Sequence, residues 1–142
     1  GESRGVAASY AEWLVLLGEA RLARGRVDEA RALGERALHR SREKQERATT
    51  TRALRLLGDI AASDAVGAEA ATRAYGEAAA LAAELGMRPL VAHCHAGLAK
   101  LCQRIGERAQ SDEELQIATT LYREMGMTYW LETLEREMGE TR

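Results

Sequence analysis

Apolar side chains recur every three or four residues through most of the chain, which is the spacing of one face of an α-helix. Residues 46–63 are an example, with Leu54, Leu57 and Ala61 on a single side. Glycines and a single proline interrupt the pattern where helices would end or begin. The predicted helices span 11–24, 27–43, 46–63, 68–85, a fifth from Pro89, a sixth after Gly106 and a seventh over about 128–138.

The same spacing predicts which side chains are buried. On the first and fifth helices we expect buried positions at Leu14, Leu17, Val91, Leu98, Cys102 and Ile105. On the seventh we expect one apolar side, formed by Trp130, Leu131, Leu134 and Met138. Its other side carries charged residues, and a helix with one apolar and one polar face is typical of the cap of a helical stack.

A repeat of about forty residues underlies this pattern. Leu57-Gly58 lies 40 residues after Leu17-Gly18, and a degenerate third copy, Leu98-Ala99, lies 41 residues further on. Small residues recur where two helices would cross closely. We expect the extra residue of the longer interval to lie in the turn at 64–67, where an insertion costs little.

These residues resemble the tetratricopeptide repeat family. The signature positions of the first copy are Leu14, Leu17, Gly18, Gly25, Ala30 and Ala37, and those of the second are Leu54, Leu57, Gly58, Ala71, Tyr75 and Ala78. The third copy departs from the signature at Ala99 and Ser111, and no copy ends in the family's proline. The long period, together with residues 85–90 and their echo at 125–130, is similar to the C-terminal arrays of bacterial signalling ATPases and cyclases.

The resemblance covers roughly residues 9–138 and implies an all-α fold. It implies a right-handed superhelix, an α-solenoid, of three helical hairpins at about 11–44, 51–85 and 91–125, with a capping helix at about 128–138. We expect residues 1–142 to form one domain. The composition agrees, because Ala, Leu, Arg and Glu dominate while Phe is absent.

In such a fold the first helix of each hairpin lines the concave face. Polar positions on these helices that the core does not use are the candidate partner-binding residues. They are Glu12, Glu19, Arg52, Arg55, Asp59, His93, Lys100 and Arg104, with Leu16 beside them. The middle and end of this set are basic, which favours an acidic segment or a carboxylate ligand. The alternative is that these long side chains only solvate a helix face.

We therefore expect a non-catalytic protein-protein interaction module, a fragment of a larger bacterial signalling or regulatory protein. The alternative is a sensor of a small ligand or peptide in the same groove. Residues 21–55 hold eleven basic and five acidic side chains, whereas residues 56–142 hold eight and fourteen. The basic strip, formed by the Arg and Lys side chains of residues 31–55, favours an acidic neighbouring domain of the same protein or the acidic end of another copy. The net charge of −2 argues against nucleic acid.

Other chemistry fails on spacing. Cys94 and Cys102 are eight residues apart on one helix, too far for a disulfide, so we expect free thiols and a reducing cytoplasm. His93 and His95 diverge on the helix, which argues against a metal site. The G-x-S-x-G pattern at residues 1–5 lacks a preceding strand, and the carboxylates at 112–114 are expected to be solvated. We expect no cofactor and no enzymatic activity.

The start of the chain adds two expectations. The chain begins at Gly1 without an initiating Met, which suggests a piece of a longer protein. No apolar run is long enough to cross a bilayer, so we expect a soluble protein that does not bind membranes. The first helix carries Trp13, Val15 and Leu16, and we expect it to be an uncovered end that can support a homodimer.

Overall fold

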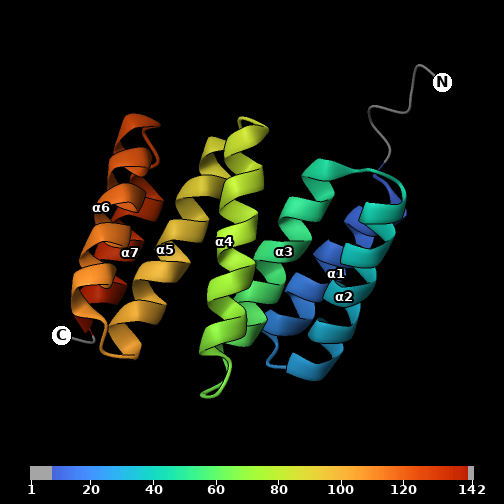
Figure 1. The fold of residues 1–142 in the computed structure, drawn as a ribbon, viewed down its shortest axis with the longest axis horizontal. Helices are drawn as coiled ribbons and strands as arrows, with labels where there is room; N and C mark the ends of the chain where they lie inside the picture. The colour runs from blue at the N-terminus through green and yellow to red at the C-terminus, as the bar shows by residue number, and fades with distance from the viewer. Residues whose placement is uncertain (1–7, 141–142) are drawn as a thin grey trace.

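The computed structural model describes residues 8–140, and within this range the chain forms seven α-helices and no strand (Figure 1). The helices are α1 (Tyr10–Ala23), α2 (Val27–Glu43), α3 (Arg47–Ala62), α4 (Ala68–Glu84), α5 (Arg88–Arg104), α6 (Arg108–Glu124) and α7 (Thr128–Glu140). The all-α prediction is confirmed. The pattern at residues 1–5 and both ends of the expected 1–142 domain lie outside the described residues.

Most of the turns between helices share one backbone conformation. Each of these three-residue turns places its middle residue at positive φ, and Gly occupies that position at 25, 86, 106 and 126. The turn after α2 has Gln45 there, at φ 57°. The turn between α3 and α4 is longer and spans residues 63–67, which agrees with the expected place of the extra residue.

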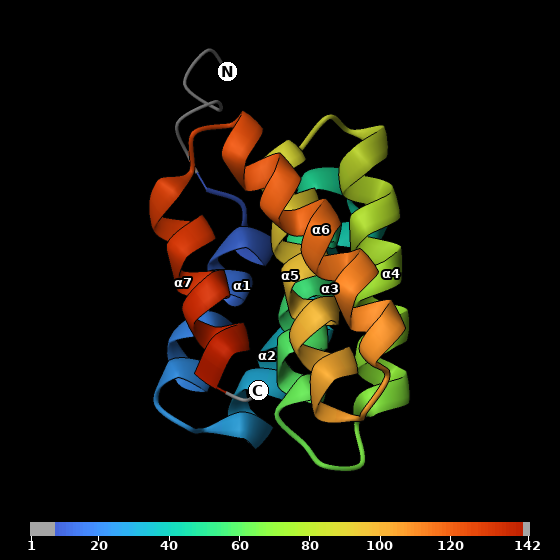
Figure 2. The same cartoon turned by 90° about the vertical axis from the view of Figure 1, so that its left-hand side faces the viewer.

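Consecutive helices pack against one another, and the odd-numbered helices also touch in series. Within the described residues α1 contacts α3, α3 contacts α5, and α5 contacts α7, whereas no contact joins α2 to α4 or α4 to α6. Figure 2 shows α1 and α7 on one side of the molecule and α4 on the other. The odd-numbered helices therefore form one continuous row.

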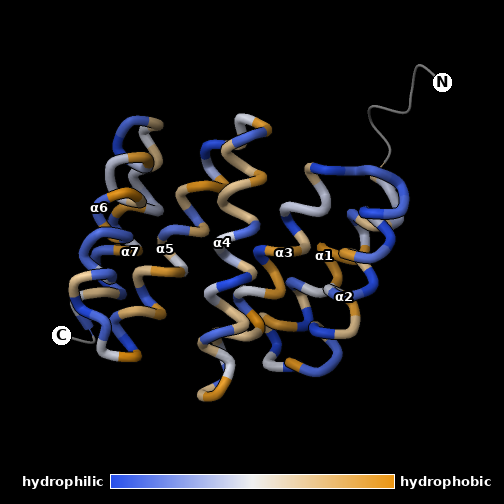
Figure 3. Tube along the Cα trace, in the orientation of Figure 1, coloured by the Kyte–Doolittle hydropathy of each residue, from blue (hydrophilic) through white to orange (hydrophobic). Residues whose placement is uncertain are grey.

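Small residues let the helices approach closely, as predicted. Ala30, Ala37, Ala71, Ala78 and Ala118 have no exposed surface. Hydrophobic and hydrophilic positions alternate along each helix in Figure 3. The result is three adjoining hydrophobic clusters rather than one central core.

Tyr75 on α4 occupies the closest crossing. A Cβ atom added at Gly58 would lie 2.8 Å from the Tyr75 ring, and one added at Gly97 would lie 2.5 Å from it. The ring therefore fills space that exists only because both positions lack a side chain. This contact joins α3, α4 and α5.

Several burial predictions are wrong. Leu17, Ile105 and Trp130 are 41%, 48% and 42% exposed, and Val15 is buried instead of forming part of an uncovered end. Within the described residues no helix precedes α1 to cover Leu17, and Ile105 follows the last residue of α5. Trp130 lies on the side of α7 that faces His93 instead of entering the core.

Acidic residues of α4 meet part of the basic strip. Arg42 pairs with Glu77 at 3.5 Å, and Arg47 pairs with Glu84 at 3.0 Å. Ion pairs between neighbouring hairpins therefore neutralise part of the positive charge of this strip.

Candidate functional site

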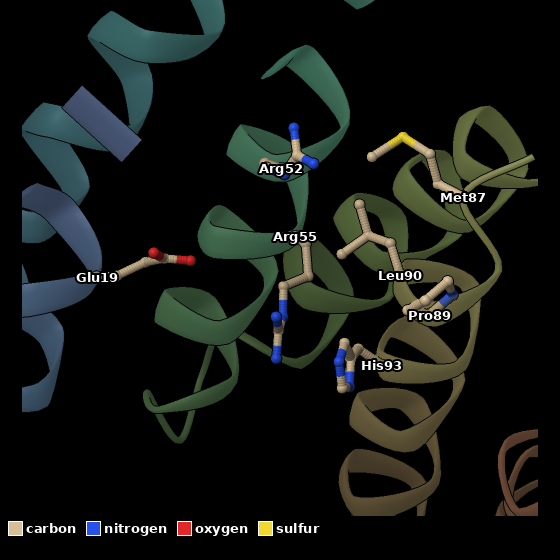
Figure 4. A pocket seen from close by; sticks show the side chains of 7 residues that line it. All are labelled: Glu19, Arg52, Arg55, Met87, Pro89, Leu90 and His93. Atoms are coloured by element: carbon tan, nitrogen blue, oxygen red, sulfur yellow. The ribbon is translucent and has the colours of Figure 1, made fainter. Parts of the chain in front are cut away.

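The row of odd-numbered helices carries a hollow of about 420 Å³ between α1, α3 and the start of α5 (Figure 4). Its lining residues are Glu19 from α1, Arg52 and Arg55 from α3, and Met87, Pro89, Leu90 and His93 from α5 and the turn before it. Figure 4 shows Glu19 on one side, the three apolar side chains on the other, and the two arginines between them. The hollow thus combines a charged side with an apolar wall.

Arg55 is held in place by the core. Its Nε atom lies 3.1 Å from Asp59 Oδ2, one helical turn away. The other oxygen of Asp59 accepts a hydrogen bond of 2.5 Å from the Tyr75 hydroxyl. Burial, reinforced by the Asp59 carboxylate, raises the pKa of Tyr75 far above its usual value. Tyr75 therefore stays protonated and fixes Asp59, which in turn orients Arg55.

Arg52 differs from Arg55 because its side chain is exposed and no ion pair holds it within the described part of the chain. Glu19 lines the same hollow, and its pKa is raised because partial burial outweighs the opposing effect of the positive charges of Arg55 and Arg52. A carboxylate that loses water is stabilised when a cation stands nearby. Arg52 is therefore the cation in this hollow most available to an incoming anion.

His93 is the neutral edge of the hollow. Its Nδ1 atom lies 2.6 Å from the Tyr122 hydroxyl, and its ring meets Trp130 edge-on at 4.8 Å. Burial, helped by the positive charges of Arg55 and Lys100, lowers the pKa of His93 to about 4. The imidazole is uncharged at pH 7 and offers a hydrogen-bonding, aromatic surface.

Two further hollows continue the first along the same row. The middle one shares Arg55 and His93 with the first and adds Tyr122, Trp130 and Glu137. The last shares Asp59, Lys100 and Glu137 with the middle one and adds Arg104. The three hollows share lining residues and follow the row from α1 to α7, and we call them together the odd-helix groove.

Cations in the later part of the odd-helix groove already have partners. Lys100 Nζ lies 3.2 Å from Glu137 Oε1 on α7. Arg104 donates a hydrogen bond to the carbonyl of Ala62, at the end of α3. These residues join neighbouring helices, so their charge is less available to a ligand than that of Arg52.

Seven of the eight predicted site residues line the odd-helix groove. Glu12 does not, because it belongs to the cap of α1: its backbone N–H donates to Ser9 Oγ at 3.1 Å, and its carboxylate accepts from the Ser9 N–H at 3.4 Å. Leu16 is half-exposed on α1 and lines none of the three hollows.

Sequence reasoning missed the apolar wall and the aromatic part of the groove. The missed residues are Met87, Pro89, Leu90, Tyr122, Trp130 and Glu137. The repeated Leu-Gly-Met segment before α5 contributes to the family resemblance. Its spacing does not predict the direction in which the Met87 side chain points. Packing of α5 beside α3 brings Met87, Pro89 and Leu90 to the two arginines. Tyr122 comes from α6, and Trp130 and Glu137 come from α7.

A separate polar pair corrects the expectation for the acidic run at 112–114. Glu114 is buried, and its Oε2 atom lies 2.5 Å from His95 Nδ1 on α5. Gln110 donates a second hydrogen bond to this carboxylate at 2.9 Å. Glu114 therefore joins α6 to α5 and is not a solvated surface residue.

The cysteines and the search for metal ligands complete the chemistry. Cys94 and Cys102 are free and buried, and burial raises the pKa of Cys94 to about 12. In residues 8–140 no group of three or more His, Cys, Asp or Glu side chains is arranged to hold a metal ion. None of the helices described combines the length and apolar character needed to cross a membrane.

No protein-family model matches the sequence, and no curated protein matches it either.

Proposed function

We propose that this chain is a non-enzymatic binding module that recognises an acidic, partly apolar peptide segment of a partner protein in the odd-helix groove. The observation that carries the proposal is Arg52, an exposed cation without an ion pair in the described structure, beside the apolar wall of Met87, Pro89 and Leu90. A carboxylate of the partner accepts charge-assisted hydrogen bonds from Arg52. A neighbouring apolar side chain of the partner packs on the wall.

The rest of the groove supports an extended occupant. Its three hollows run along the row from α1 to α7, so a peptide several residues long can contact all of them. Arg55 is oriented by Asp59 before any partner arrives, and an oriented cation loses less side-chain freedom on binding. Neutral His93 and half-exposed Trp130 supply an aromatic surface in the middle.

We further propose that the chain is a tetratricopeptide-type α-solenoid, with the hairpins at 11–44, 51–85 and 91–125 and α7 as cap. The contacts between successive odd-numbered helices and the small residues at the crossings support this reading. A cytoplasmic location and a role within a larger bacterial signalling protein are parts of the same proposal. They rest on the resemblance of the repeat and on the two free thiols.

The second candidate is a sensor of a small carboxylate ligand. The first hollow, at about 420 Å³, falls within the range of about 300–1,000 Å³ that is common for small-molecule sites. Such a ligand would fill only this hollow and would leave Trp130 and Lys100 untouched.

The test uses a fluorescent peptide that alternates Glu and Leu, with a Lys and Leu peptide as its matched control. The chain should bind the acidic peptide, and Arg52→Glu should weaken binding about tenfold or more, since it replaces attraction by repulsion. Arg24→Glu makes the same charge change on an exposed residue outside the groove and should leave binding nearly unchanged.

The outcomes separate the two candidates. If Trp130→Ala also lowers the affinity for the acidic peptide, the occupant is extended. Binding only of small carboxylates, lost on Arg52→Glu and unaffected by Trp130→Ala, supports the sensor. Peptide binding that is unchanged by Arg52→Glu would show that the groove is not the binding site.

A further inference from the structure

His93 has one ring nitrogen that the rest of the described chain does not use. Its Nδ1 atom lies 2.6 Å from the Tyr122 hydroxyl, whereas its Nε2 atom has no hydrogen-bond partner within residues 8–140. The side-chain atoms of this range that are buried and lack a hydrogen bond are Glu46 Oε1 and Arg55 Nε. Nε2 of His93 is not among them, so it is the ring nitrogen that can meet an occupant of the odd-helix groove.

The Tyr122 hydroxyl determines where the proton of this ring lies. Tyr122 is 2% exposed, and within the described residues its hydroxyl has His93 Nδ1 as its hydrogen-bond partner. The hydroxyl donates to Nδ1, since the opposite arrangement would leave a buried O–H without an acceptor. Burial raises the pKa of Tyr122 to about 12, so the phenol keeps its proton at pH 7. The proton of the neutral imidazole then lies on Nε2.

Two neighbouring rings hold His93 in place. Trp130 meets it edge-on at 4.8 Å, and the Tyr122 ring lies 5.5 Å away at an interplanar angle of 57°. Tyr122 belongs to α6 and Trp130 to α7, so two other helices fix a side chain of α5. A donor that is already fixed loses little side-chain freedom when it binds an acceptor.

Arg55 supplies further donors next to His93. These are the two residues that line both the first and the middle hollow, and we call the space between them the Arg55–His93 junction. In Figure 4 the Arg55 side chain extends toward the end of the first hollow at which the His93 ring lies. Its terminal nitrogens have no partner within the described residues and, unlike Nε, are not among the buried atoms. Donors from α3 and α5 therefore border one space to which these residues bring no acceptor.

The charges around the junction favour an uncharged acceptor. Asp59 lies 3.1 Å from Arg55 and balances its charge, and Glu137 does the same for Lys100 at 3.2 Å. His93 is neutral. A carboxylate finds no excess of positive charge here, in contrast to Arg52. A peptide carbonyl can accept hydrogen bonds from these donors without bringing a charge.

We infer that the Arg55–His93 junction binds a main-chain carbonyl of the peptide, with His93 Nε2–H as a donor and Tyr122 as the residue that positions it. The inference rests on the proposed function, because it takes the occupant of the groove to be a peptide. Arg52 and Arg55 are three residues apart on α3, so their Cβ atoms are about 5–6 Å apart. An extended chain advances about 3.3 Å per residue, which places this carbonyl about one or two residues from the acidic side chain at Arg52.

NMR of the free chain tests the proton position without any ligand. The nitrogen spectrum of the ring should show a protonated Nε2 and a bare Nδ1, and His93→Gln identifies these signals among the three histidines. Tyr122→Phe keeps the ring of residue 122 but removes the hydroxyl, so both tautomers should appear. A protonated Nδ1 in the native chain, or a spectrum that Tyr122→Phe leaves unchanged, would overturn the inference.

Binding of the Glu and Leu peptide tests the donor. His93→Leu should weaken binding roughly three- to tenfold, which is the weight of one neutral hydrogen bond. His93→Gln retains an N–H donor and should recover most of this loss, which a merely structural role of the ring does not predict. His39→Leu makes the same change on an exposed residue of α2 outside the groove and should leave the affinity unchanged. Melting curves check that each variant is folded.

Peptides with an ester in place of one amide test the acceptor, because an ester carbonyl is the weaker acceptor. At one linkage the ester should weaken binding to the native chain several-fold more than binding to His93→Leu. An ester also removes an N–H, so the difference between the two proteins, and not the loss itself, identifies the carbonyl. Equal losses for both proteins at every linkage would overturn the inference.

The outcomes separate this inference from the proposed function. If Arg52→Glu abolishes peptide binding while His93→Leu leaves it unchanged, the groove binds the peptide and the carbonyl site is wrong. If the native chain does not bind the peptide, the proposed function is wrong and the carbonyl site is wrong with it. Affinity that falls in His93→Leu, recovers in His93→Gln and depends on one linkage supports both.

Discussion

The hydroxyl of Tyr75 donates a 2.5 Å hydrogen bond to Asp59, and this bond connects the packed interior to the odd-helix groove. The ring of Tyr75 fills the space between Gly58 and Gly97, while its hydroxyl reaches the carboxylate that pairs with Arg55. Packing of α4 between α3 and α5 therefore sets the position of a charged group on the opposite, groove-forming side.

Removing that hydroxyl should affect both stability and the groove. Tyr75→Phe keeps the ring but takes a donor from a partly buried carboxylate, so we expect the free energy of unfolding to fall by about 1–3 kcal/mol. Urea denaturation measures the loss. Tyr129→Phe, on a residue that is 68% exposed, should change nothing, and equal stability of both variants would contradict a structural role for the bond.

The close crossing at Gly97 should not tolerate even one carbon. In Gly97→Ala the new Cβ would lie 2.5 Å from Tyr75 Cζ, so α5 or the ring must shift, at an expected cost of about 1–3 kcal/mol. Thermal unfolding provides the comparison. Gly76→Ala is the matched control, because nothing lies within 4 Å of an added Cβ on α4 and alanine is the better helix former by about 0.5–1 kcal/mol.

The turn after α2 should be improved by glycine. Gln45 adopts φ 57°, where a side chain costs roughly 1 kcal/mol, and the four other three-residue turns place Gly there. Gln45→Gly should therefore raise the free energy of unfolding by about 0.5–1 kcal/mol. Gln45→Ala keeps the Cβ atom and should give no such gain; a gain from alanine equal to that from glycine would show that backbone strain is not the cause.

His93 should make the fold sensitive to acid. Its pKa in the folded chain is about 4, below its ordinary value of 6.5, so between these values the unfolded chain binds the proton more readily. The free energy of unfolding should therefore fall as the pH drops from about 6.5 to about 4, and this contribution should be missing in His93→Gln. Identical pH profiles of the two proteins, or an NMR titration of His93 near its ordinary pKa, would contradict the burial described here.

Much of the helical framework is visible in the sequence because it depends on local rules. The spacing of apolar residues and the glycines at turns determine where α2 begins at Val27 and where α5 ends near Gly106. The small residues of the repeat, such as Ala37 and Ala78, are buried as expected. These features need no knowledge of which helices become neighbours in space.

The errors arise where burial depends on a neighbour that spacing alone does not specify. Leu17 and Leu57 occupy the same position of the repeat, but within the described residues only Leu57 follows a hairpin on which it can pack. Glu114 looks like one member of an acidic surface run until α6 places it against His95. The groove is similar: its cations could be proposed from the repeat, whereas the apolar wall at Met87 and Leu90 depends on how α5 lies beside α3.

The two buried thiols give α5 a property that its neighbours lack. Cys94 has no exposed surface, Cys102 is 8% exposed, and these are the two cysteines of the whole sequence. An alkylating reagent needs a thiolate, and burial raises the pKa of Cys94 to about 12, so modification must wait until α5 opens. Fraying of α1 or α7 leaves Cys94 covered, so its labelling rate reports how often the centre of the chain exposes itself, separately from events at the ends.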